Sequence, residues 1–103
     1  MIESRHEPSL DLTILVGTGL VETSQVLAAM DQMYAGEPTR LVLWDFSGAD
    51  ITPIDFPGVQ EIAKLAVKYG RQRPGGKTAI VTSQQVAFGI SRVYESLIQG
   101  TVA

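Results

Sequence analysis

The chain contains no cysteine and only one histidine, His6, among its 103 residues. Disulfide bonds and thiolate metal sites are therefore excluded, and a single imidazole cannot form a zinc site without several carboxylate partners. No apolar run approaches the ~20 residues of a membrane-spanning helix, and residues 1–6 lack the apolar stretch of a signal peptide. We therefore expect a cytoplasmic protein that holds no metal ion and does not insert into a membrane.

Charged residues are also scarce, at 18% of the chain, and they leave a formal net charge of -3. An acidic chain has no bulk attraction to nucleic acid or to anionic membrane surfaces, so we expect no nucleic-acid partner. Hydrophobic residues make up 45%, which is typical of a folded protein and not of a disordered one. The length indicates a single domain, residues 1–103, built around one core.

Apolar residues recur with two periods along the chain. Alternation and β-branched residues predict strands at residues 2–7, 12–18, 41–46 and 78–82. A period of 3.6 predicts helices at residues 24–35, 56–71 and 84–99. The third predicted strand is apolar on both faces, as in the interior of a parallel sheet. The pattern β-β-α-β-α-β-α therefore predicts an α/β fold with three helices and a mostly parallel four-stranded sheet, whose first two strands form an antiparallel hairpin.

The segment between the third predicted strand and the second predicted helix holds the first candidate binding residues. In open α/β sheets, ligands and partners typically bind at the carboxyl ends of the strands. Asp50, Thr52 and Asp55 offer two carboxylates and a hydroxyl, which suit Mg²⁺ or a partner. The alternative is that Asp55 caps the helix, with Pro57 in its first turn, and that Asp50 is solvated. We interpret residues 47–57 as a contact surface because of their position.

Two short motifs in this region resemble the STAS domain, the family of anti-sigma-factor antagonists and sulfate-transporter tails. In that family a strand ends in an Asp-Leu-Ser-like turn, and an Asp-Ser-Ser-Gly-Leu sequence opens the next helix. Here the turn is Asp45-Phe46-Ser47, and Asp55, Gly58 and Val59 match the start of the helix. The resemblance implies a STAS-like fold and a regulatory, non-enzymatic role in binding another protein.

The chain departs from the STAS pattern at the position that is phosphorylated in the family. Phe56 and Pro57 occupy the two serine positions, so the phosphoacceptor is missing. If its side chain is exposed, Phe56 is instead an apolar anchor for a protein partner.

A bacterial branch of STAS-like and Sec14-like proteins is more similar. Its motifs are Trp44-Asp45, an Arg-Pro-Gly-Gly break at residues 73–76, and an Ala-Phe-Gly-x-x-Arg-x-Tyr helix at residues 87–94. The Sec14-like side of this resemblance implies an alternative function, a carrier or sensor that binds a lipid or a nucleotide. Asp45 and Arg92 are its candidate ligand-binding residues, since a guanidinium can hold a phosphate or a carboxylate. The other interpretation of Arg92 is a surface pair with Glu95.

The sequence offers no catalytic set. No nucleophile, base and stabilising group can be named together, and no Gly-x-Ser-x-Gly motif is present. We therefore expect a protein that is not an enzyme and uses no cofactor. Five basic residues near the end of the second predicted helix are interpreted as a solvated face: Lys64, Lys68, Arg71, Arg73 and Lys77.

Two features predict a homodimer. STAS-like proteins carry a further strand after the last one predicted here, so residues 77–82 would form an edge with unpaired backbone groups. The second apolar face of the strand at residues 41–46 also needs a cover. A two-fold dimer, the commonest closed oligomer, would bury both.

Overall fold

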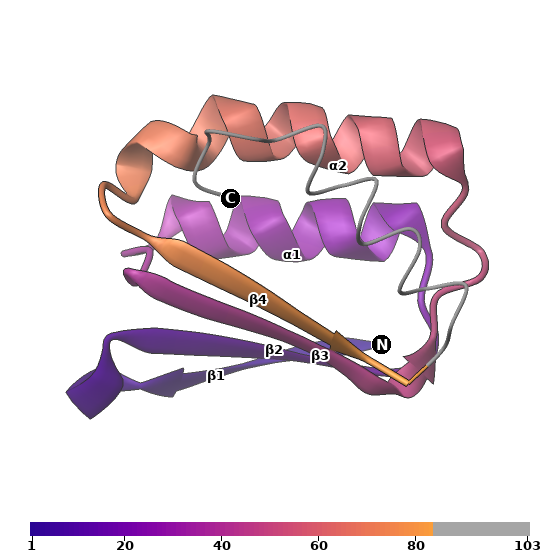
Figure 1. Cartoon of the computed structure of the whole chain (residues 1–103), viewed down its shortest axis with the longest axis horizontal. Helices are drawn as coiled ribbons and strands as arrows, with labels where there is room; N and C mark the ends of the chain where they lie inside the picture. Colours follow the sequence, from indigo (N-terminus) through magenta and orange to yellow (C-terminus); the bar gives the residue numbers. More distant parts are fainter. Residues whose placement is uncertain (84–103) are drawn as a thin grey trace.

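The computed structural model describes residues 1–83, which form one sheet with two helices on one of its faces (Figure 1). The elements in chain order are β1 (Ile2–Glu7), η1 (Pro8–Leu10), β2 (Leu12–Leu20), α1 (Thr23–Ala35), β3 (Leu41–Asp50), α2 (Phe56–Tyr69), η2 (Gly70–Gln72) and β4 (Lys77–Thr82). The third predicted helix, residues 84–99, lies outside the described residues.

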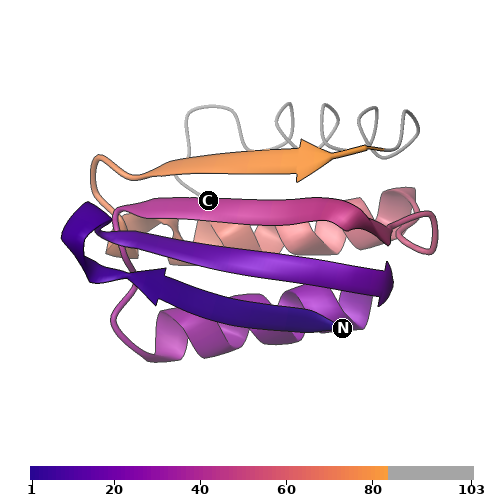
Figure 2. The same cartoon turned by 90° about the horizontal axis from the view of Figure 1, so that it is seen from below.

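The sheet confirms the predicted α/β class. Its strands lie in the order β1-β2-β3-β4, side by side in Figure 2. β1 and β2 pair antiparallel as a hairpin, and β2, β3 and β4 pair parallel. The hairpin turns through η1 and through Asp11, whose φ of 49° is left-handed. Because α1 and α2 connect parallel neighbours, both cross the same face of the sheet (Figure 1).

The two central strands are longer than the sequence predicts. β2 continues to Leu20 and β3 to Asp50, and the parallel ladder resumes after an irregularity that includes Gly17. A Cβ atom on Gly17 would lie 2.6 Å from the Phe46 ring, so only glycine fits this position. The last residues of both strands are mostly glycine and polar residues, which show no apolar alternation. The sequence pattern therefore predicts strands that end earlier, at residues 18 and 46. The following loop is therefore only residues 51–55.

The core lies between the sheet and the helices. Alternate residues of β2 and β3 meet the apolar stripes of α1 and α2, and the residues that are most buried include Leu15, Val26, Met30, Val42, Trp44, Phe46, Val59, Ile62 and Ala66. The helices also meet each other, because Tyr34 stacks on Tyr69 at 4.6 Å between ring centroids. None of the described helices is long and apolar enough to cross a membrane.

The interpretation of Arg73 as part of a solvated basic face is wrong, because only 2% of this residue is exposed. The guanidinium contacts the backbone where β3 and β4 begin. It donates hydrogen bonds of 2.8 to 3.3 Å to five acceptors, which are the carbonyls of Thr39, Arg40 and Lys77 and the hydroxyls of Tyr34 and Thr78. Arg73 therefore joins segments that are up to 39 residues apart in sequence.

Candidate functional site

The predicted contact surface is a short loop with two buried anchors. Ile51 and Ile54 are 3% and 4% exposed, and the Ile54 N–H donates to the Ile51 carbonyl at 3.0 Å. The Val21 N–H donates to the Asp50 carbonyl at 2.9 Å, which ties the start of the loop to the end of β2. Apolar burial at two positions and these backbone bonds hold the intervening polar residues in a defined arrangement.

The carboxylates before and within this region bond to their own sequence neighbours. Asp45 Oδ1 accepts from the Ser47 hydroxyl at 2.6 Å and from the Ser47 N–H at 3.0 Å. Asp50 Oδ1 accepts in the same way from Thr52, at 2.7 and 3.0 Å. The hydroxyl and N–H of Ser47, with a smaller contribution from Arg5, lower the pKa of the Asp45 carboxyl below its usual value.

These bonds give the two acid–hydroxyl pairs a role in local turn geometry. Among residues 1–83, no three histidine, aspartate or glutamate side chains gather in a way that could hold a metal ion.

Asp55 caps α2, which confirms the structural interpretation of this residue. Its Oδ1 accepts from the Gly58 N–H at 2.9 Å, and its carbonyl accepts from Val59 at 3.0 Å. Pro57 lies in the first turn, where its missing N–H costs no intrahelical bond. Gly58 is buried against Thr23, so the first turns of α1 and α2 touch.

Large apolar side chains are exposed at the same end of the molecule. Phe56, the first residue of α2, is 56% exposed, and Pro57 beside it is exposed as well. Leu20, at the end of β2, is 65% exposed. The sequence interpretation missed Leu20. The signal that could have identified Leu20 is its place directly after Gly19. Neither Thr18 nor Glu22, two residues away on each side, is an apolar residue with which Leu20 could share a buried face.

The predicted ligand pair is placed only in part. Asp45 lies on β3 and bonds to Ser47, whereas Arg92 lies outside the described residues.

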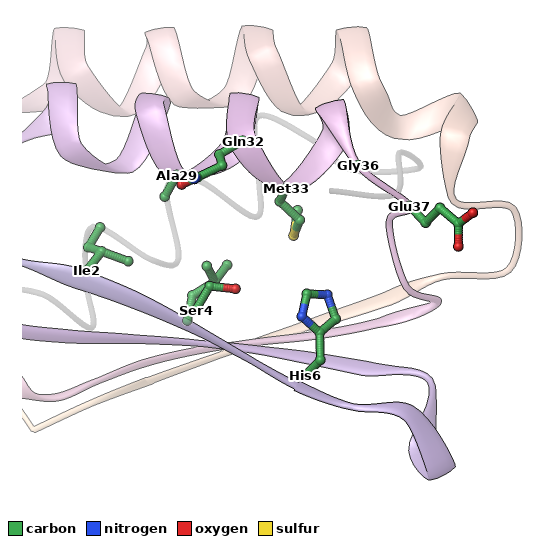
Figure 3. Close-up of a pocket in the computed structure, with 9 residues that line it drawn as sticks. Ile2, Ser4, His6, Ala29, Gln32, Met33, Gly36 and Glu37 are labelled. Carbon is green, nitrogen blue, oxygen red and sulfur yellow. The ribbon is translucent and has the colours of Figure 1, made fainter.

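A separate hollow of about 360 Å³ lies between β1 and α1 (Figure 3). Ser4 and His6 rise from β1 toward the helix, and Met33 points down from α1. Because Ser4 is small and His6 is polar, β1 presents no row of large apolar side chains to close this space. Gln32 and Glu37 add further polar groups to its wall.

A solved structure shares the arrangement of strands and helices. It is a crystal structure of a protein named Mglu, with a TM-score of 0.55 and 19% sequence identity over 82% of this chain. The match covers 20% of the Mglu chain, so this chain spans only a small part of that protein's length. At this identity the likeness concerns the fold alone. No protein-family model and no curated protein matches the sequence.

Proposed function

We propose that this chain is a STAS-like protein-interaction module, acting in the cytoplasm and without catalytic activity of its own. The observation that carries the proposal is Phe56, a large aromatic residue that is 56% exposed at the start of α2. Exposed aromatic residues with a defined position are frequent energetic centres of protein interfaces. Phe56 and Pro57 form the apolar centre, and Asp50, Thr52 and Asp55 form its polar border.

The way in which Phe56 is held in place supports the same interpretation. Ile51 and Ile54 are anchored in the core, and Asp55 caps the helix on which Phe56 stands. A partner that binds there orders few side chains on this protein, so little of the interaction energy is lost to conformational entropy. The family's phosphorylation switch has no place here, because Phe56 and Pro57 stand at the two serine positions.

Pull-down from a lysate of the source cells tests this proposal, using the wild-type protein and two matched variants as bait. Phe56→Ser removes the proposed anchor. Val67→Ser changes another exposed apolar residue on the same helix, 50% exposed and about three turns away. We expect a stoichiometric partner that Val67→Ser retains and Phe56→Ser loses. Equal recovery by both variants would contradict the proposal.

A second candidate function is binding of a small molecule, and the hollow between β1 and α1 favours it. Ligand sites occupy roughly 300 Å³ or more, and this hollow reaches that size. Ala29 lines it, whereas the adjacent Ala28 is exposed. Native mass spectrometry of freshly purified protein would show a co-purified lipid or nucleotide that Ala29→Leu loses and Ala28→Leu keeps. Ligand-free wild-type protein would contradict this function.

A further inference from the structure

β1 is an edge strand, and no segment among residues 1–83 pairs with its outer side. The strand order places β1 at one end of the sheet, next to β2 alone (Figure 2). The outer side of an edge strand presents backbone N–H and C=O groups that can pair with another extended chain. What such an edge accepts depends on the side chains that accompany these backbone groups.

The hydrogen bonds of the hairpin show which residues of β1 turn their backbone groups outward. Met1 and Thr18 exchange two backbone bonds, each of 2.9 Å. Bonded and non-bonded pairs alternate along an antiparallel ladder, so Glu3, Arg5 and Glu7 bond to β2. The N–H and C=O groups of the residues between them therefore point to the outer edge, and these residues are Ile2, Ser4 and His6.

The same three residues line the hollow between β1 and α1 (Figure 3). The hollow holds about 360 Å³, and α1 extends past the outer edge of β1 in Figure 2. Residues directly opposite each other on paired strands have their side chains on the same face of the sheet. A strand added along β1 would therefore place every second side chain in the hollow, beside α1.

We propose that this edge binds an extended peptide segment of a partner protein, which adds one strand to the sheet and fills the hollow with its alternate side chains. The outward backbone groups require an extended chain, and the hollow requires side chains at alternate positions. A peptide strand supplies both. In proteins that bind peptides by strand addition, main-chain hydrogen bonds give affinity, and pockets for alternate side chains give specificity.

The charges on β1 favour one type of peptide sequence. Glu3, Arg5 and Glu7 alternate with the residues that line the hollow, so they lie on the other face of the strand. Opposite charges on directly paired residues are favourable, and like charges are not. The peptide should therefore carry Lys, Glu and Lys at alternate positions. Apolar residues between them enter the hollow beside Ala29 and Met33. This charge order is the same in both chain directions, so it suits parallel and antiparallel addition.

An NMR titration of the whole 103-residue chain with the peptide Lys-Val-Glu-Leu-Lys-Val tests the proposal. We expect hydrogen exchange to slow at the N–H groups of Ser4 and His6, which gain acceptors, and to stay unchanged at Arg5, which already bonds to β2. The charge-reversed peptide Glu-Val-Lys-Leu-Glu-Val is the matched control and should bind about tenfold more weakly.

Three results of this titration would overturn the proposal. The first is equal binding of the two peptides. The second is unchanged exchange at Ser4 and His6 when the peptide is present at millimolar concentration. The third is slow exchange of both groups in the free protein, because another segment of the chain or a second copy would then occupy the edge.

Two pairs of variants test the position of the peptide. Ser4→Pro removes an outward N–H, and proline is compatible with an edge strand at such a position. It should weaken peptide binding about tenfold, whereas Ser4→Ala keeps the N–H and should bind like the wild type. Ala29→Leu fills the hollow and should also weaken binding, and Ala28→Leu at an exposed position should not. If Ser4→Pro does not fold, the variants at positions 28 and 29 still decide. Binding that Ala29→Leu leaves intact would place the peptide on another surface.

The same variants distinguish this peptide site from the two functions proposed above. A small molecule in the hollow would be lost by Ala29→Leu and retained by Ser4→Pro, whereas the peptide depends on both positions. A partner at Phe56 would be lost by Phe56→Ser, which should leave peptide binding unchanged.

Discussion

Gly58 lies so close to Thr23 that a methyl group at position 58 would overlap the Thr23 hydroxyl. This contact brings the first turns of α2 and α1 together, and it holds the helix end on which Phe56 stands. Glycine at position 58 therefore has a local physical reason in this chain, which is the close approach between two helices.

Gly58→Ala should lower the free energy of unfolding by about 1–2 kcal/mol in urea denaturation, since overpacking outweighs the gain in helix propensity. Thr23→Ala removes the obstructing oxygen, so the double variant should recover part of the loss. Gly48→Ala is the control, because a Cβ atom there meets nothing within 4 Å. Equal stability of the Gly58 and Gly48 variants would contradict the packing argument.

Asp55→Ala should cost about 1 kcal/mol of stability, because the Gly58 N–H loses its acceptor at the start of α2. Asp55→Asn keeps an acceptor oxygen and should remain within a few tenths of a kcal/mol of the wild type. Urea denaturation of both variants measures the difference. If alanine and asparagine are equally tolerated, the cap does not stabilise the helix end that carries Phe56.

Incubation with an anti-sigma-type kinase and ATP should leave the intact mass of the protein unchanged. Phe56 and Pro57 have no hydroxyl, and the hydroxyls of Ser47 and Thr52 already donate to carboxylates. A serine-containing STAS protein serves as the positive control. A stoichiometric mass increase that maps to Ser47 or Thr52 would show that a phosphorylation switch exists in another register.

The Asp45 carboxyl should titrate below its usual pKa in an NMR pH titration, and Ser47→Ala should raise that pKa. A folded-state pKa below the unfolded value means that the ionised carboxylate stabilises the fold. The stabilisation is therefore complete above the unfolded pKa, near pH 4, and is lost as the pH falls through the folded-state value. The stability difference between wild type and Ser47→Ala should shrink in acid. A difference that is constant with pH would exclude the Asp45–Ser47 bond as its cause.

Arg73→Ala should lower the free energy of unfolding by about 3 kcal/mol or more, because it removes five hydrogen bonds made by an almost fully buried guanidinium. Arg71→Ala, two residues earlier and exposed, should change it by less than about 0.5 kcal/mol. Urea denaturation of the two variants side by side separates a structural arginine from a solvated one. Similar midpoints would contradict the assignment.

Much of this fold follows from the order of residues alone. The β-branched run of β2, the doubly apolar β3 and the 3.6-residue stripes of α1 and α2 each indicate the type of element and the side chains that it buries. Gly36 and Pro38 close α1, and Asp55 with Pro57 opens α2, as local backbone chemistry predicts. Element types and the mostly parallel sheet could therefore be predicted before any contact was known.

The tertiary structure decided where the long side chains go. Arg73 has the same local surroundings as the solvated Arg71, yet it is buried because carbonyls of Thr39 and Arg40, more than 30 residues away, converge on its guanidinium. The exposure of Phe56 depends in the same way on how elements pack against each other. Periodicity within an element records a shared face, but only packing between distant segments determines whether that face meets protein or solvent.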